Sequence, residues 1–291
     1  MKNYIVNTDN TYLFNNIYKD MDILCDKYND LLSKKIIGKS VEGRNIFALK
    51  ISTNKNSGYT DNKPALLLVG GIHAREDFSV MLVMKMIDYY CYYYNEEDDL
   101  DEYNVKKILD NCDIHFIPVA NPDGLYIVRY GLEASSNYSV LKEMKIWGED
   151  HTFWKANANG VDLNKNFDDG NWDIRLCIPG TDVPCSDRFK GFKPNSEPET
   201  IALINYCKSN NFYMMISYHC SGNCTFWADS GTHNLFNGLD EKIIDEFSSK
   251  FIYRKTKISQ DPAIYGCGFE NWFRKRIKRP AFCIELSPYV E

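Results

Sequence analysis

The sequence lacks any apolar run long enough to cross a lipid bilayer, and its first residues, MKNYIVNTDNTYLFNN, contain no apolar core of signal-peptide length. Positive charge is not in excess either, since the formal net charge is −6, which argues against nucleic acid and anionic membrane surfaces as partners. The one basic cluster, RKRIKR at 274–279, is expected to be the solvated face of a helix. These absences predict a cytoplasmic protein with no nucleic acid and no membrane among its partners.

Internal repeats, low-complexity segments and proline- or serine-rich linkers are also missing, so we expect a single domain over residues 1–291. The ten cysteines include no repeated CxxC knuckle of the kind that holds a structural zinc ion. We expect buried thiols, above all in the apolar runs around Cys91, Cys207 and Cys283. In an oxidising compartment the pairs most able to bridge would be Cys177 with Cys185 and Cys220 with Cys224.

What the sequence does contain is an alternation of helical and extended segments. The predicted helices cover 12–34, 78–94, 101–109, about 196–210, 239–250 and 268–277. The predicted strands cover 36–40, 45–52, 65–70, 113–119, 212–219 and 281–286, with turns at VEGR and NPDG. Ser196 and Glu199 have capping-box spacing. Short apolar strands separated by helices predict an α/β fold: a mixed, mainly parallel twisted sheet with helices on both faces.

Histidine is scarce, with five residues, and one of them follows a predicted buried strand in GGIHARED (70–77). His73 and Glu76 could be two zinc ligands in one loop. The pattern HxxE is common by chance, however, and taken alone it favours a loop histidine beside a carboxylate at a helix N-terminus. His219 ends another predicted strand, and ligands of parallel sheets gather at the carboxyl ends of strands.

The other histidines and one carboxylate complete the set of candidates. His115 lies inside a predicted strand and is expected to pack there, whereas His151 and His233 lie in polar loops and are expected to be solvated. Glu285 lies within the apolar strand AFCIEL. A carboxylate in that environment must be paired or functional, because burying it unpaired is costly.

Six segments occur in the order and spacing of a known family: SVEGRNIFALKI, GGIHARE, IPVANPDG, WKANANGVDLNKNF, SYHCSG and KRPAFCIEL. From about residue 36 to 288 the chain resembles the zinc metallocarboxypeptidases (carboxypeptidase A-like). The sequences of its segments WKAN…GVDLN and RPAFCIEL resemble the bacterial branch that includes γ-D-glutamyl-diaminopimelate peptidases. The resemblance implies the zinc carboxypeptidase fold, a Zn²⁺ cofactor held by His73, Glu76 and His219, and Glu285 as the general base.

The chain departs from the family pattern at several positions that the resemblance assigns to the substrate. The Asn-Arg pair that holds the substrate's terminal carboxylate in the family is here Asn164 and Lys165, and lysine lacks the two-pronged guanidinium. Lys155 is the only cation where the family has an oxyanion-stabilising arginine. Tyr265 fits the tyrosine that closes over the substrate, or else packs under a loop. Glu270 falls near the specificity pocket, where it would favour an amine, or else is an exposed helix residue.

The resemblance implies a zinc metallopeptidase of the carboxypeptidase type that acts on a peptide or isopeptide bond near the C-terminus. The favoured substrate is a cell-wall (peptidoglycan) peptide containing diaminopimelate, and the protein is expected to be a monomer or a small homo-oligomer. Three alternatives remain: a general carboxypeptidase on peptides with basic C-terminal residues, an inactive peptide-binding protein on the same fold, and an amidohydrolase that deacylates amino acids.

Overall fold

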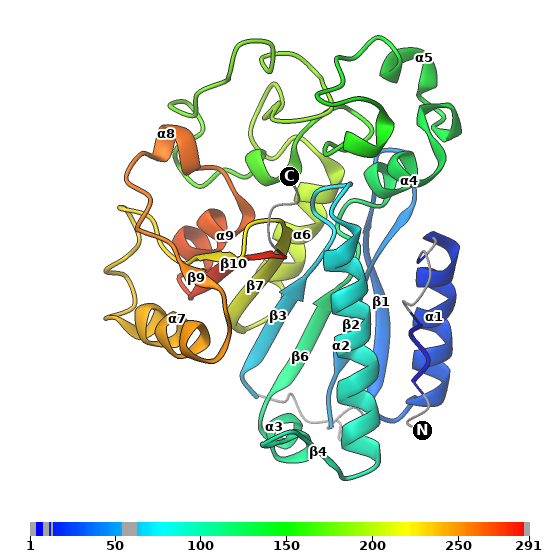
Figure 1. Cartoon of the computed structure of the whole chain (residues 1–291), viewed down its shortest axis with the longest axis vertical. Coiled ribbons are helices and arrows are strands. Elements are labelled where there is room, and N and C mark those ends of the chain that lie inside the picture. Colours follow the sequence, from blue (N-terminus) through cyan, green and yellow to red (C-terminus); the bar gives the residue numbers. More distant parts are fainter. Residues whose placement is uncertain (1–3, 8–11, 13, 54–62, 288–291) are drawn as a thin grey trace.

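The computed structural model describes residues 4–7, 12, 14–53 and 63–287, and its main feature is an eight-stranded sheet with the order β1-β2-β6-β3-β7-β10-β8-β9 (Figure 1). The strands of this sheet are β1 (Leu32–Lys39), β2 (Asn45–Ile51), β3 (Ala65–Val69), β6 (Asp113–Ile117), β7 (Phe212–Cys220), β8 (Cys224–Phe226), β9 (Arg254–Lys255) and β10 (Ala281–Leu286). The central strands β6, β3, β7 and β10 are parallel to one another. The pairs β1–β2, β2–β6 and β10–β8 are antiparallel, and β9 is parallel to β8. The predicted fold class is confirmed.

The helices vary widely in length. The longer ones are α1 (Phe14–Lys27), α2 (Asp77–Asn95), α3 (Val105–Asn111), α4 (Pro122–Tyr130), α6 (Pro198–Lys208) and α7 (Leu239–Lys250). The short ones are η1 (Leu132–Ala134), α5 (Tyr138–Leu141), η2 (His151–Phe153), η3 (Leu163–Lys165), α8 (Pro262–Tyr265), α9 (Phe269–Trp272) and the π-helical turn η4 (Phe273–Ile277). A two-stranded ribbon of β4 (Asp99–Leu100) and β5 (Tyr103–Asn104) precedes α3. None of the helices in the described ranges is both long and apolar enough to span a bilayer.

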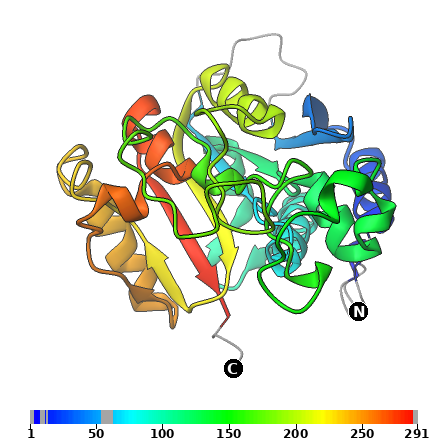
Figure 2. The same cartoon turned by 90° about the horizontal axis from the view of Figure 1, so that it is seen from above.

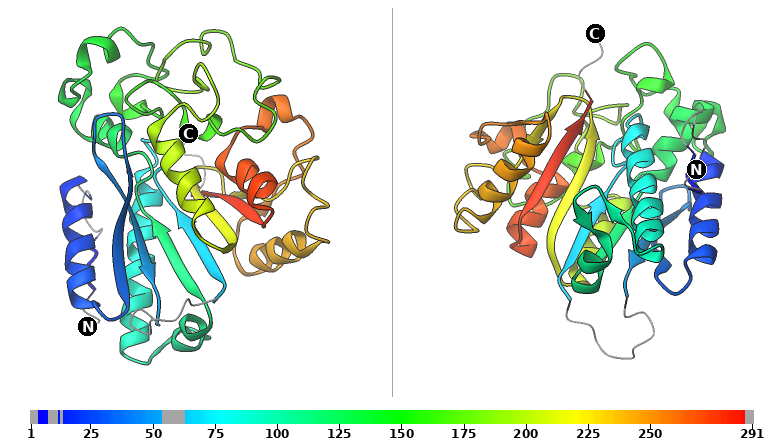
Figure 3. Two further views of the ribbon diagram at one scale, coloured as in Figure 1. Left: turned by 180° about the vertical axis from the view of Figure 1, so that it is seen from behind. Right: turned by 60° about the horizontal axis from the view of Figure 1, so that its bottom comes forward.

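Alternate residues of the central strands pack on opposite faces of the sheet, as the two-residue period of a strand requires. Leu68 of β3 belongs to the core under α1, α2 and α3, whereas Leu67 and Val69 belong to the core under α6 and α9. In Figure 1, α2 lies in front of the sheet, and the reverse view in Figure 3 has α6 in front. Helices therefore cover both faces of the sheet.

The segment between α4 and α6 lies over the carboxyl ends of the parallel strands (Figures 1 and 2). It contains only short helices joined by turns, yet several of its side chains are fully buried, including Trp154, Leu163 and Phe167. Such a segment forms the roof of the end at which α/β proteins place their sites.

Four sequence predictions about the elements are wrong in detail. The first helix ends at Lys27 rather than at 34, because the following residues enter β1. NPDG is not only a turn: Asn121 caps α4 through a hydrogen bond from the Gly124 N–H, and Pro122 occupies its first turn. The predicted helix 101–109 begins only at Val105, after the β4–β5 ribbon. Ser196 forms no capping box at α6.

The basic run 274–279 is also not simply a solvated face. Arg274 is fully buried and donates to the carboxylate of Asp240 at 2.6 Å and to the carbonyl oxygen of Thr232 at 3.1 Å. A buried charge is tolerated only when it is paired in this way. Lys275 is partly buried and pairs with Asp169 at 3.0 Å, whereas Arg276, Lys278 and Arg279 are exposed as expected.

Candidate metal centre and active site

The loop that carries the HxxE pair is tied closely to the neighbouring strand. The N–H of Gly70 donates to the carbonyl oxygen of Ile117 at 2.9 Å. A Cβ on Gly70 would lie 2.8 Å from the carbonyl oxygen of Ser79 in α2, and Gly71 has a φ of +61°, a conformation that favours glycine. The two glycines therefore let strand and helix approach closely, which fixes the loop between them.

Glu76 immediately precedes α2, but its side chain makes no capping hydrogen bond to that helix. Its two carboxylate oxygens instead face the histidines: Oε1 lies 2.9 Å from Nδ1 of His73, and Oε2 lies 3.0 Å from Nδ1 of His219, near the end of β7. The two Nδ1 atoms are 3.0 Å apart, and all three residues are buried. The three predicted ligands thus meet at one point, which the helix-cap interpretation does not explain.

The far nitrogen of each imidazole also has a partner. His73 Nε2 lies 3.1 Å from Oδ1 of Asp162, and His219 Nε2 lies 2.9 Å from Oγ of Ser217. Partners on the outer nitrogen fix the orientation and tautomer of a metal-binding histidine. Both rings are therefore held with Nδ1 directed toward Glu76.

The electrostatics of this cluster favour a bound cation. Burial raises the pKa of Glu76, but the two histidines outweigh it and hold that pKa well below its ordinary value. Burial lowers the pKa of His219, and Glu76 outweighs this and raises it to about 9. Two imidazole nitrogens and a carboxylate within 4.8 Å of one another are also the ligand set of many catalytic zinc sites. The residues present fit a Zn²⁺ ion.

Glu285 lies beside this cluster because of the strand register. In the parallel pair of β7 and β10, Glu285 is the partner of His219, so both side chains point to the same face. Burial raises the pKa of Glu285, Glu76 adds to this, and His219 opposes it. A carboxylate with a raised pKa next to a metal centre is suited to accept and return a proton.

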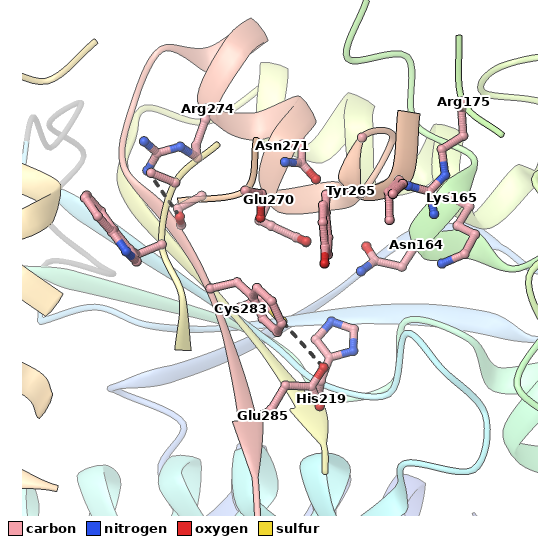
Figure 4. A pocket seen from close by; sticks show the side chains of 18 of the residues that line it. Asn164, Lys165, Arg175, His219, Tyr265, Glu270, Asn271, Arg274, Cys283 and Glu285 are labelled. Carbon is pink, nitrogen blue, oxygen red and sulfur yellow. Dashed lines mark hydrogen bonds between the residues drawn. The ribbon is translucent and has the colours of Figure 1, made fainter. Parts of the chain in front are cut away.

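These groups open into a pocket that also contains the predicted substrate residues (Figure 4). The lining residues important to the argument are His73, Lys155, Asn164, Lys165, Arg175, His219, Tyr265, Glu270, Cys283 and Glu285. In Figure 4, Asn164, Lys165 and Arg175 lie on one side of the pocket and Glu270 on the other. Cations and a carboxylate therefore occupy opposite walls.

The two lysines of the pocket have different environments. Nζ of Lys165 lies 3.3 Å from Oδ2 of Asp162, but burial, together with the charges of Lys155 and Arg175, lowers the pKa of Lys165. Burial also opposes the charge of Lys155, yet Asp162, Glu76 and Asp187 outweigh it and raise its pKa. Lys155 is thus the more strongly held cation, next to the metal centre.

The remaining predicted residues also line the pocket. Asn164 accepts a hydrogen bond through Oδ1 from the N–H of Phe269 at 2.8 Å, which joins it to the start of α9. Tyr265 projects into the pocket with half of its surface exposed (Figure 4). Oε2 of Glu270 is buried without a hydrogen-bond partner. Tyr265 is therefore not packed under a loop, and Glu270 is only partly exposed.

Sequence reasoning missed three residues of the site. Asp162 lies in the recognised segment GVDLN, and Ser217 lies two positions before His219 on the same face of the strand, so the two-residue period could have pointed to it. Arg175 lies in the irregular roof segment, where no periodicity indicates which way a side chain points. His115, by contrast, packs as predicted, with Nδ1 2.6 Å from Oη of Tyr206.

The family profile described as "Zinc carboxypeptidase" matches residues 17–288. The chain belongs to the zinc carboxypeptidase family. Its site therefore combines a family zinc-ligand pattern with a ligand geometry that fits the ion.

Curated relatives come from bacteria and animals. The chain is 26% identical over 218 residues to gamma-D-glutamyl-L-diamino acid endopeptidase 1 of Lysinibacillus sphaericus, covering 74% of this chain and 52% of the relative. It is 32% identical over 209 residues to carboxypeptidase A1 of Mus musculus, covering 70% of this chain and 43% of the relative. The chain thus spans about half of the length of these relatives.

A solved structure agrees on the fold. That of thrombin activatable fibrinolysis inhibitor (TAFI) has a TM-score of 0.67 at 21% identity, covering 94% of this chain and 65% of that one. At this identity, the likeness concerns the architecture alone.

Proposed function

We propose that this protein is a zinc-dependent peptidase that hydrolyses a peptide or isopeptide bond near the C-terminal end of its substrate, with diaminopimelate-containing cell-wall peptides as the favoured substrate. The observation that carries the proposal is the convergence of His73, Glu76 and His219 beside Glu285 at the base of one pocket.

In this proposal each residue has one task. His73, Glu76 and His219 would hold the Zn²⁺ ion, which when bound would supply Lewis acidity and lower the pKa of a water molecule to about 7. Glu285 accepts the proton of the attacking water on its carboxylate and returns it to the leaving nitrogen. Lys155, a pocket cation whose pKa the charges of Asp162 and Glu76 raise, stabilises the negative charge that develops on the carbonyl oxygen.

The substrate preference rests on Glu270. Its carboxylate faces the pocket with one oxygen buried and unpaired, so a substrate ammonium group would satisfy it. Diaminopimelate carries such a group, and a diamino-acid endopeptidase is among the relatives. Lysine carries one too, so a carboxypeptidase on basic C-terminal residues is the second candidate.

A substrate panel tests the proposal. We expect the zinc-loaded protein to cleave γ-D-glutamyl-diaminopimelate peptides faster than peptides ending in lysine, and both faster than peptides ending in leucine, with activity lost to a chelator. Brisk cleavage of lysine peptides alone would favour the second candidate. Zinc retained with tight peptide binding and no turnover on any peptide would instead indicate an inactive binding protein.

The matched variant in this assay is Glu285→Gln, which keeps the shape of the side chain. It should retain the zinc content of the wild type by elemental analysis while turnover falls by roughly 10²- to 10⁴-fold, the usual contribution of a general base. Retained turnover would remove Glu285 from this role.

A further inference from the structure

Arg175 is a cation of the pocket with no counter-ion in the described part of the chain. Its Nε and Nη1 atoms are buried without a hydrogen-bond partner, and its side chain lines the same pocket as Lys165 and Glu285 (Figure 4). Burial lowers its pKa, and the charges of Cys267, Asp162 and Asp169 oppose this without outweighing it. Buried guanidinium nitrogens without a partner are costly unless a ligand satisfies them.

The backbone of Arg175 is fixed on both sides, so its position does not depend on a loose loop. Its N–H donates to the carbonyl oxygen of Asn171 at 3.0 Å, and its own carbonyl oxygen accepts from Nζ of Lys190 at 2.9 Å. The next N–H, of Leu176, donates to the carbonyl oxygen of Ala263 at 2.9 Å. This last bond joins the Arg175 turn to α8, the helix that carries Tyr265.

The two lysines of the pocket differ from Arg175 in this respect. Lys165 pairs with Asp162 at 3.3 Å, and the charges of Asp162, Glu76 and Asp187 raise the pKa of Lys155, the residue proposed above to stabilise the oxyanion. Arg175 is therefore the pocket cation with buried, unpartnered nitrogens among the described residues and no other role. Its planar donor fork matches a carboxylate better than an ammonium group does. Glu270 on the opposite wall repels a carboxylate and attracts an ammonium group. The two walls therefore orient a ligand that carries both charges.

Resting on the peptidase function proposed above, we infer that Arg175 is a specificity-determining residue that binds the C-terminal carboxylate of the peptide, a role for which Lys165 alone lacks the fork. The carboxylate lies against Arg175 and Lys165, and the side-chain ammonium of the same terminal residue lies against Glu270. Terminal residues with both groups are therefore selected, and amidated peptides are rejected.

Binding to the zinc-loaded, full-length Glu285→Gln variant tests the inference without cleavage. By calorimetry it should bind a peptide ending in lysine roughly 10- to 100-fold more tightly than the same peptide with a C-terminal amide, the range expected for hydrogen bonds to a charged group. Adding Arg175→Met should remove this preference while leaving binding of the amide unchanged, and Arg175→Lys should restore it in part. Arg276→Met removes the same charge from an exposed residue outside the pocket and should retain the full preference.

Three results would overturn the inference: an unchanged preference after Arg175→Met, no preference in the Glu285→Gln variant itself, or equal loss of acid and amide binding. An amidated peptide ending in glutamate carries a side-chain carboxylate but no C-terminal one. If Arg175 bound it as tightly as the peptide with a free C-terminus, the ligand of Arg175 would be a side-chain carboxylate instead. Hydrolysis of the same peptides and of γ-D-glutamyl-diaminopimelate peptides by the wild type is measured in parallel. No hydrolysis of any of them would refute the peptidase function, while the binding ratio still decides the role of Arg175.

Discussion

At the scale of single residues, Asp162 connects the metal centre to the substrate wall. One of its oxygens, Oδ1, lies 3.1 Å from Nε2 of His73 and also accepts from the N–H of Asn164, and the other faces Lys165. Burial opposes its charge, but Lys165 and His73 outweigh burial and hold the pKa of Asp162 well below its ordinary value. A single ionised carboxylate thus orients a ligand and compensates a substrate-binding cation.

Asp162→Asn should therefore weaken zinc binding by roughly 10- to 100-fold, the usual effect of losing a partner behind a metal ligand. Competition with a chromogenic chelator measures this affinity. Asp168→Asn is the matched control, because Asp168 pairs with Arg276 away from the pocket and should leave the affinity unchanged. Equal affinities for wild type and Asp162→Asn would contradict the orienting role.

The sequence was informative about residues where a motif existed and silent where none did. The segments GGIHARE, SYHCSG and AFCIEL led to the ligands and to Glu285. No motif marks Arg175, because its orientation results from a turn held by Lys190 and Ala263, which are 15 and 88 residues away. Contacts between distant segments of irregular structure leave no local pattern in a sequence.

At the scale of elements, the first turn of α6 is bound to the roof segment instead of capping itself. Oε1 of Glu199 accepts from the N–H of Val41 at 3.1 Å, and Oε2 accepts from Nδ2 of Asn157 at 3.1 Å. Burial raises the pKa of Glu199 to about 7, against the opposing hydrogen bonds from the protein. The predicted capping box fails because this glutamate is used to hold α6 against the segment that precedes GVDLN.

This burial predicts a pH dependence of stability. Because folding raises the pKa of Glu199 from 4.5 to about 7, its contribution to the free energy of unfolding is complete below pH 4.5 and is lost as the pH rises to about 7. Glu199→Gln should remove this loss, which amounts to about 1.4 kcal/mol for each pH unit of the window. The free energies of unfolding measured with urea at pH 5 and pH 8 should therefore differ less in Glu199→Gln than in the wild type. The exposed Glu241→Gln in α7 should behave as the wild type, and an unchanged pH dependence in Glu199→Gln would refute the assignment.

Helices and strands with a sustained apolar pattern were predictable from the sequence, whereas short elements were not. The strand 281–286 and the helix 239–250 match the structure to the residue. The three-residue β8 and the helix α4 were missed, because β8 pairs through residues distant in sequence and NPDG reads as a turn. The turn and the helix cap use the same residue types, so only the tertiary structure decides between them.

At the scale of the whole molecule, the ten cysteines form no covalent framework. All ten lie in the described part of the chain and none forms a disulfide, including both pairs considered for bridging, and six of them are buried. Cys91, Cys207 and Cys283 are buried as expected. The sheet and its two cores therefore hold the fold together without cross-links.

Titration with a thiol reagent should accordingly count ten thiols in denaturant, with or without prior reduction. In the native protein Cys177 should react first, because it is the one cysteine with an exposed side chain. Thermal unfolding should not change on addition of a reductant. Fewer than ten thiols before reduction would indicate a disulfide.

The pairing of His219 with Glu285 across β7 and β10 also limits how the gene can change. Since successive side chains of a strand alternate between faces, one codon added or removed between Ala281 and Glu285 would turn the carboxylate to the wrong side of the sheet. The roof segment between α4 and α6 contains no strand whose side chains must keep to one face, so it can lengthen or shorten at its exposed turns. We therefore expect insertions among descendants of this chain to accumulate in the roof, which would vary the substrate while the hydrolytic centre stays unchanged.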